Sequence, residues 1–160
     1  MRQRLLVGPI LLALVGALVT VTAAPAGAGG GDHEFAAGVV RLSGSQEVPG
    51  PGDPDGFGRF GYFAKGDQLC YFLTAHKIDP AAAAHIHAGA AGVAGGIVVG
   101  LEVPDPQSAA CITAVPGGVP NTDGVLSQAD LDAIIANPAG FYANVHNAAF
   151  QAGAIRGQLR

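Results

Sequence analysis

The sequence has 160 residues, of which 49% are hydrophobic and only 12% are charged, and its formal net charge is −4 at pH 7. Its few basic residues form no cluster, which argues against a surface that binds the phosphate backbone of a nucleic acid. The 25 glycines and 11 prolines interrupt the chain too often for long helices, so short strands joined by turns are expected.

The N-terminus has the three parts of a secretory signal peptide. A basic start, MRQR, precedes an apolar run over residues 5–24, and Ala26-Gly27-Ala28 offers small residues for cleavage. An apolar run of about 20 residues is also long enough for a membrane anchor. Because Pro9 and Gly16 weaken a permanent spanning helix, we predict a cleaved signal peptide over residues 1–28.

Cleavage after residue 28 leaves a chain of the size of one ordinary domain. We predict a flexible lead over residues 29–35, followed by a single domain over residues 36–160. Two of the eight basic residues leave with the signal peptide while all 12 acidic residues stay, so the mature chain carries a net charge of −6. The predicted protein is secreted, with neither a nucleic acid nor, after cleavage, a membrane as its partner.

Runs of β-branched and aromatic residues between Gly and Pro predict an all-β fold, a Greek-key sandwich or barrel. Gly66-Asp67 predicts a two-residue hairpin turn, and both faces of that hairpin are largely apolar, as in the central strands of a sandwich. The expected strands are residues 35–42, 56–65, 68–75, 82–88, 96–103, 110–115, 140–146 and 154–159.

One segment departs from the strand pattern. Ser127 is a suitable N-cap, and the apolar residues from Leu131 onward recur at helical spacing. We predict one short helix over residues 130–136, ended by Asn137-Pro138. Residues 104–108 contain too much proline for a central strand and are predicted to form a loop.

Cys70 and Cys111 are the only cysteines in the sequence. In an exported protein an even number of cysteines favours a disulfide, which we predict between these two. The alternative is a pair of buried free thiols. A bond that closes a loop of about 40 residues contributes roughly 4 kcal/mol in the chain-entropy treatment.

His85-Ile86-His87 is the first motif with metal-binding chemistry. Alternate residues of a strand point to the same face, so both imidazoles face the same way. Two such imidazoles can chelate one ion, and they favour Cu, Zn or Ni over hard cations. The alternative is a pair of solvent-facing or hydrogen-bonded histidines without a ligand role.

Asn144-Val145-His146 offers a third imidazole on a later strand. The middle residue is expected to face the core, so the outer two share the opposite face. If the two strands are neighbours, His85, His87 and His146 converge in a manner that suits a Cu or Zn ion with one open position. His76 is a candidate fourth member, although a turn-exposed histidine is the simpler interpretation.

Glu47 and Arg156 each lie in a short apolar stretch, where a charge needs a partner. We predict that Arg156 ties the last strand to the opening loop through a bidentate contact with the Glu47 carboxylate. The alternative is that Arg156 steers a small anion toward a nearby metal. No serine lies in a nucleophile elbow and no glycine-rich phosphate loop precedes a helix, so no catalytic residue is predicted.

Three segments, in this order, resemble the CHRD (chordin-type) domain family: RLSGSQEVP, AAAAHIHAGAAGVAGGIVVGL and NPAGFYANVHNAAFQAGAIRGQL. The resemblance covers residues 39–159. Asn147 and Gln151 depart from the usual pattern, and neither change removes a candidate ligand. The positions that match the family motifs are Gly44, Glu47, Val48, His85, His87, Gly89, Asn144, His146, Gly153, Arg156 and Gly157.

The resemblance implies an immunoglobulin-like or superoxide-dismutase-like Greek-key fold, because the CHRD family is distantly similar to copper-zinc superoxide dismutases. In that comparison His85 and His87 correspond to a copper-binding strand, with His146 as a third ligand. The bridging histidine and the zinc loop of the dismutases have no counterpart in residues 90–118, which contain no histidine.

For function, the resemblance implies a secreted binding module without established catalysis, whose extracellular ligand the sequence does not specify. The alternatives are a copper- or zinc-binding protein that uses the three histidines, and a dismutase-like redox enzyme. The metal alternative depends on whether the three imidazoles approach one point, and an enzyme also needs an open coordination position in a pocket.

Overall fold

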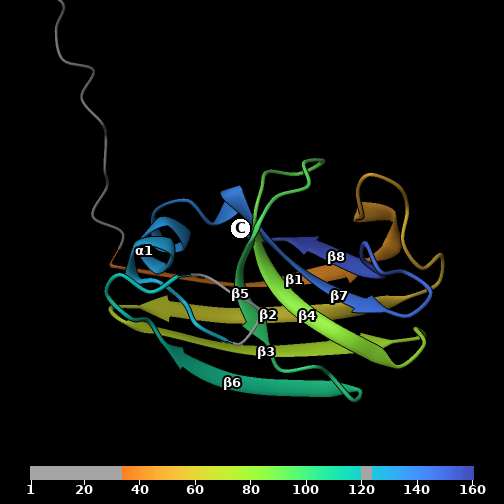
Figure 1. Cartoon of the computed structure of the whole chain (residues 1–160), viewed down its shortest axis with the longest axis horizontal. Coiled ribbons are helices and arrows are strands. Elements are labelled where there is room, and N and C mark those ends of the chain that lie inside the picture. The colour runs from red at the N-terminus through yellow and green to blue at the C-terminus, as the bar shows by residue number, and fades with distance from the viewer. Residues whose placement is uncertain (1–33, 120–123) are drawn as a thin grey trace, which may run out of the picture.

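Eight antiparallel strands form one curled sheet in the computed structural model, which describes residues 34–119 and 124–160. The order across the sheet is β5-β4-β7-β8-β1-β2-β3-β6 (Figure 1). This confirms the predicted all-β class. The strands are β1 (Phe35–Ser43), β2 (Phe57–Lys65), β3 (Gln68–His76), β4 (Ala81–Ala88), β5 (Ile97–Leu101), β6 (Gln107–Thr113), β7 (Phe141–Asn147) and β8 (Ile155–Gln158).

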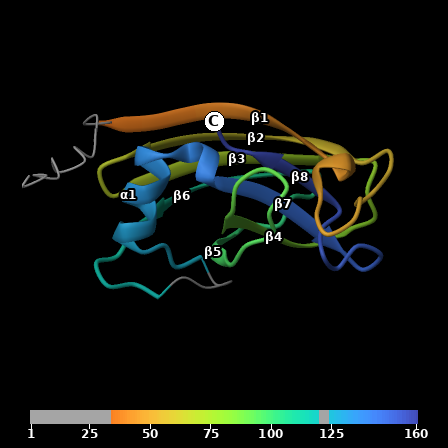
Figure 2. The same ribbon diagram turned by 90° about the horizontal axis from the view of Figure 1, so that it is seen from above.

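The sheet curls so that β4, β5, β7 and β8 face β1, β2, β3 and β6 (Figures 1 and 2). The two layers are joined at β1 and β8 by a single backbone pair, Ser43 with Arg156. Apolar side chains from both layers fill the space between them, and their burial supplies the main stabilisation of the fold. Completely buried members of this core include Phe60, Leu69, Leu73, Ile86, Val99, Val145 and Ile155.

The predicted helix is confirmed as α1 (Gln128–Ala136), which lies at one end of the two layers (Figure 2). The Ser127 hydroxyl accepts a hydrogen bond from the Asp130 backbone N–H over 3.0 Å, as an N-cap does. Leu131 and Ile134 are completely buried. Of the described helices, none is long and apolar enough to span a membrane.

Two short 3-10 helices, η1 (Gly44–Gln46) and η2 (Pro138–Gly140), complete the ordered elements. The predicted hairpin turn is confirmed between β2 and β3, where Gly66 has a φ of +60°. The prediction for β6 was wrong by three residues at its start. Because the backbone N–H of Ala75 donates to the Pro106 carbonyl, the ladder with β3 extends up to the proline and the strand begins at Gln107.

The β2–β3 hairpin buries one of its two apolar faces. Phe60 and Tyr62 point into the core, whereas Phe63 and Phe72 remain 46% and 42% exposed on the outer face. The opposite layer packs against the inner face alone, so the outer face keeps solvent contact.

Strand β1 begins at Phe35, as the strand pattern predicts, although the expected lead over 29–35 also includes this residue. The predicted signal peptide over residues 1–28 lies outside the described residues.

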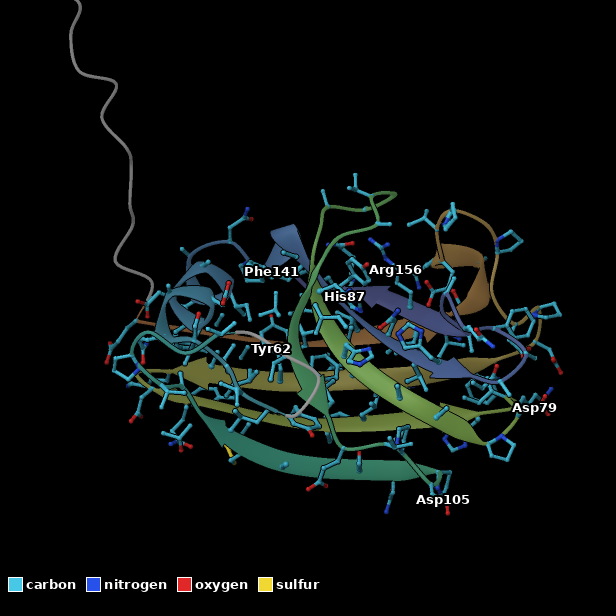
Figure 3. All side chains as sticks on the ribbon, in the orientation of Figure 1. Tyr62, Asp79, His87, Asp105, Phe141 and Arg156 are labelled. Atoms are coloured by element: carbon cyan, nitrogen blue, oxygen red, sulfur yellow. A yellow bond between two sulfur atoms is a disulfide. The ribbon has the colours of Figure 1, made fainter. Side chains whose placement is uncertain are left out.

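The predicted disulfide is present. Cys70 on β3 lies directly opposite Cys111 on β6, and the two sulfurs are bonded (Figure 3). The bond therefore fastens the edge strand β6 to its neighbour β3 in the same layer.

Replacing both cysteines by serine (Cys70→Ser with Cys111→Ser) is expected to lower the free energy of unfolding by about 2–4 kcal/mol. The reason is that the bond closes a loop with a sequence separation of 41 residues. Urea unfolding measures the loss, and dithiothreitol should destabilise the wild type but leave the variant unchanged. A variant as stable as the oxidised wild type would contradict this expectation.

Candidate functional site

Pairing between β4 and β7 places the candidate histidines side by side. His85 lies directly opposite Asn144 in the antiparallel register. His87 and His146 project from the same face, whereas Ile86, between the two histidines of β4, is completely buried in the core. The adjacency on which the three-histidine hypothesis depends is therefore present.

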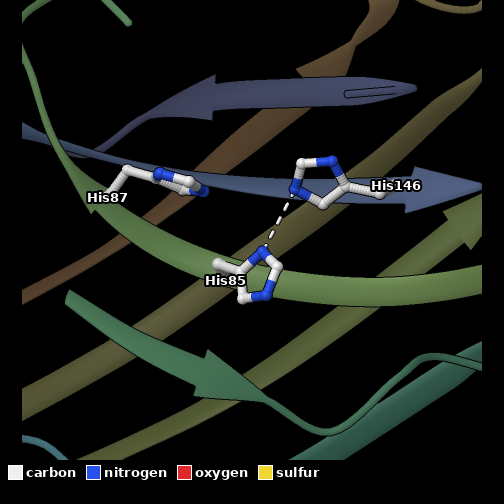
Figure 4. Close-up of side chains that lie close together, drawn as sticks. All are labelled: His85, His87 and His146. Atoms are coloured by element: carbon white, nitrogen blue, oxygen red, sulfur yellow. Dashed lines mark hydrogen bonds between the residues drawn. The ribbon is translucent and has the colours of Figure 1, made fainter. Parts of the chain in front are cut away.

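The three imidazoles converge in space. One potential ligand atom from each of His85, His87 and His146 lies within 4.8 Å of the others. The shortest separation is 3.1 Å, between His85 Nδ1 and His146 Nε2 (Figure 4). His76 is not a member of this group, and its ring packs against Phe57 instead.

Backbone carbonyls fix the tautomers of two of the rings. His87 Nδ1 lies 2.9 Å from the Gly95 carbonyl oxygen, and His146 Nδ1 lies 3.0 Å from the Gln151 carbonyl oxygen. A carbonyl oxygen only accepts, so both Nδ1 atoms carry the proton and donate. In the neutral rings each Nε2 atom is then left with its lone pair.

The cluster consequently has more acceptors than protons. His146 Nε2 lies 3.1 Å both from His85 Nδ1 and from the Asn144 side-chain oxygen. His87 Nε2 is buried and has no hydrogen-bond partner. At most one proton, on His85 Nδ1, is left to serve these acceptors, which is fewer than their lone pairs require.

Burial favours the neutral form of all three imidazoles. It lowers the pKa of His85 to about 4, with further lowering by the neighbouring His146 and His87. Burial also lowers the pKa of His87 and of His146, and the hydrogen bonds to Gly95 and Gln151 oppose the shift in part. The neutral form is the one that can ligate a metal.

A stack of three side chains supports His87. Its ring lies parallel to that of Tyr142, with centroids 4.8 Å apart, and the Arg156 guanidinium carbon lies 3.4 Å from the Tyr142 centroid. Since β7 lies between β4 and β8, the phenol ring separates the imidazole from the cation. Sequence analysis missed Tyr142, although it shares the alternation that places Asn144 and His146 on one face.

The predicted bidentate contact between Arg156 and Glu47 is wrong. The guanidinium instead donates to the carbonyl oxygens of Val93 and Ala90, over 3.0 Å each, and to the Gln158 side chain. The ion pairs among the described residues join other side chains. Strand β8 directs Arg156 toward the loop before β5, where these carbonyls lie, so its N–H groups hold that loop in place.

Glu47 is nevertheless buried beside the cluster, with 7% of its surface exposed. Burial raises its pKa to about 7, while the charge of Arg156 and hydrogen bonds with the Val48 backbone and the Asn144 side chain oppose the shift. One carboxylate oxygen, Oε1, has no hydrogen-bond partner. A Cβ atom at Gly153 would lie 2.3 Å from the Glu47 carboxyl carbon, so the absent side chain there makes room for the carboxylate.

A surface pocket of about 440 Å³ opens beside the imidazoles. No charged side chain lines it. An ion held by the three histidines would therefore keep a coordination position that faces a neutral and largely apolar space. The lining residues are Ala82, Ala83, His85, His87, Ile97, His146, Asn147, Ala148 and Gln151.

Comparison with known proteins identifies one family. The family model described as the CHRD domain matches residues 39–159, which is most of the chain and contains every residue of the cluster. No curated protein and no solved structure matches the chain. The distant similarity to dismutases therefore stays a prediction.

Acidification from pH 6.5 to 4 is expected to lower the free energy of unfolding. His85, His87 and His146 have folded-state pKa values below the usual 6.5, so the unfolded chain binds more protons in this range. Glu47 acts in the opposite direction, because its raised pKa favours the folded state as pH falls below 7. Urea unfolding at several pH values measures the net change in the free energy of unfolding, to which the three histidines and Glu47 contribute with opposite sign.

In this experiment His85→Gln should flatten the pH dependence of the unfolding free energy. His76→Gln, which changes an imidazole outside the cluster, should leave it unaltered. A steeper dependence in the first variant, or equal effects of both, would contradict the assignment.

Gly153→Ala is expected to destabilise the fold by about 1–3 kcal/mol. The residue has a φ of +146°, and its new Cβ would collide with the Glu47 carboxylate. Gly50→Ala is the matched control, since its Cβ would meet nothing within 4 Å. Thermal unfolding of both variants makes the comparison, and equal stability would show that the Glu47 contact is not tight.

Proposed function

Because the chain belongs to the CHRD domain family, we propose that it is an extracellular binding protein whose ligand is a single copper or zinc ion held by His85, His87 and His146. The observation that carries this proposal is the shortage of protons in the cluster. Its imidazole lone pairs and one amide oxygen point at one another with at most one proton among them. A cation in their midst would satisfy all of them at once.

The donor set favours a borderline transition ion. All three candidate ligands are neutral imidazoles, without a thiolate or a carboxylate among them, and imidazole suits zinc and copper better than magnesium or calcium. On binding, the proton on His85 Nδ1 can move to the other ring nitrogen, because neutral imidazole exists in both tautomers. The ring then ligates without becoming charged.

The spacing is close to that of an occupied site. With zinc–nitrogen bonds of up to 2.1 Å, two ligands of one ion are at most about 4.2 Å apart. The shortest pair, at 3.1 Å, already lies inside this limit. At tetrahedral angles such ligands are only about 3.4 Å apart, so closing the remaining pairs from their upper bound of 4.8 Å requires side-chain movements of about 1 Å.

Outer hydrogen bonds support the same interpretation. The Nδ1 atoms of His87 and His146 donate to backbone carbonyls, which is the usual way in which metal-binding histidines are oriented. These contacts hold both Nε2 atoms toward the centre of the cluster. Extracellular placement is consistent with the family and with the disulfide between Cys70 and Cys111.

A dismutase-like redox activity has less support. Within residues 34–119 and 124–160, the histidine cluster is the one group of three or more potential ligands that comes together, so the described part of the chain offers no second metal centre. The N–H groups of Arg156 that would attract an anion are bonded to carbonyl oxygens. Metal binding without dismutation is therefore the function that we favour.

The test is metal titration of protein prepared without a histidine tag. Isothermal calorimetry and native mass spectrometry should show one Zn²⁺ or Cu²⁺ per chain. Affinity should be retained at pH 6.5 and fall as the pH is lowered toward 4, because the pKa values of the three imidazoles lie below 6.5 and protonated imidazole cannot ligate. His87→Ala should weaken binding at least about tenfold, as expected for the loss of a ligand supported by outer contacts.

His76→Ala is the matched control, because it removes a histidine that packs against Phe57 outside the cluster. Equal losses in the two variants would indicate adventitious surface binding. Absence of stoichiometric binding to the wild type would overturn the proposed function itself.

A further inference from the structure

Glu47 is a buried carboxylate without a directly bonded cation. Only 7% of its surface is exposed, its Oε1 atom has no hydrogen-bond partner, and no ion pair joins it to Arg156. Removing an ionised group from water costs several kcal/mol unless a charge or a set of hydrogen bonds offsets it. The contacts of the metal-free chain leave this cost only partly offset.

Asn144 connects this carboxylate with the histidine cluster. It is 2% exposed, and its side-chain oxygen lies 3.1 Å from His146 Nε2. Its side chain also lowers the pKa of Glu47, as a hydrogen-bond partner of the carboxylate does. A single buried amide therefore lies between the carboxylate and one of the candidate ligands, His146.

Among the residues that the structure describes, no carboxylate belongs to the ligand group or lines the adjoining pocket. Asp79 and Asp105 lie well away from His87 (Figure 3). An ion held by three neutral rings would thus bring a positive charge into a buried site that already contains Arg156.

We propose that Glu47, acting through Asn144, is the buried counter-charge of the metal site and biases the site toward divalent over monovalent ions. This inference rests on the proposed function. The carboxylate compensates the charge of an ion that it does not touch, and the amide between them keeps it from becoming a ligand. The Coulomb energy of this pair scales with the charge of the ion, so a divalent ion gains twice as much as a monovalent one.

The experiment compares Zn²⁺ with Ag⁺, two closed-shell ions that imidazole binds and that differ in charge. Glu47→Gln keeps the shape of the side chain and removes its charge. At pH 8, where the wild-type carboxylate with its pKa of about 7 is ionised, this variant should bind Zn²⁺ about tenfold more weakly and Ag⁺ about threefold more weakly. The ratio of the two affinities should therefore fall about threefold.

Two control variants separate charge from packing. Glu47→Asp retains the charge but changes the fit, so the Zn²⁺ to Ag⁺ ratio should stay at the wild-type value even if both affinities fall. Glu102→Gln removes a charge from an exposed side chain, which salt screens at 0.1 M ionic strength, and should alter neither affinity. Thermal unfolding of each metal-free variant checks that it is folded.

Equal losses for the two ions in Glu47→Gln would assign a purely structural role to the carboxylate and overturn the inference. No loss for either ion would overturn it as well. The inference would also be overturned if the Zn²⁺ to Ag⁺ affinity ratio fell as much in Glu47→Asp as in Glu47→Gln. Failure of the wild type to bind Zn²⁺ is a separate result, because it removes the proposed function on which this inference rests.

Discussion

The register between β4 and β7 is the constraint on which the site depends. The two strands are more than 50 residues apart in the sequence, and their pairing places His85 opposite Asn144. A slip of one residue would turn Ile86 out of the core and both histidines of β4 into it. Burial of Ile86 and Val145 on the inner face therefore holds three imidazoles together on the outer one, and the packing of the core determines the geometry of the site.

Arg156 is buried at the side of the site that the loop before β5 covers. Arg156 is 1% exposed, and its guanidinium is bonded to carbonyls of the loop before β5 and lies over the ring of Tyr142. A buried cation of this kind needs acceptors and a π-face to offset its lost hydration. The same loop supplies the Gly95 carbonyl that fixes the His87 tautomer. Desolvation of Arg156 and orientation of His87 are therefore two results of one loop conformation.

Local sequence patterns were sufficient for the helix and for the strands other than the start of β6, because alternation and capping act within a short segment, and the cysteine count indicated the disulfide. They also placed His85 and His87 on one face, since the period of two is a property of any strand. They did not identify the partner of Arg156, because that choice depends on which loop β8 passes in three dimensions. The role of Asn144 was equally inaccessible, since it depends on Glu47, which lies nearly 100 residues earlier in the loop between β1 and β2 and comes next to Asn144 only in the folded chain.

That opening loop reaches the site because β1 and β8 meet at only one backbone pair, so loop contacts must complete the junction between the layers. The Asp53 backbone N–H donates to the Ala154 carbonyl over 2.8 Å, and a Cβ at Gly52 would lie 2.3 Å from the same oxygen. This close approach requires glycine, and it brings Glu47 against Gly153 and next to Asn144.

The three separated motifs of the family thus form three sides of one site. The opening motif supplies the carboxylate, the middle motif supplies two imidazoles, and the closing motif supplies the third imidazole together with the amide that lies between the carboxylate and the cluster. The contact between the first and last strands therefore brings the carboxylate to the cluster.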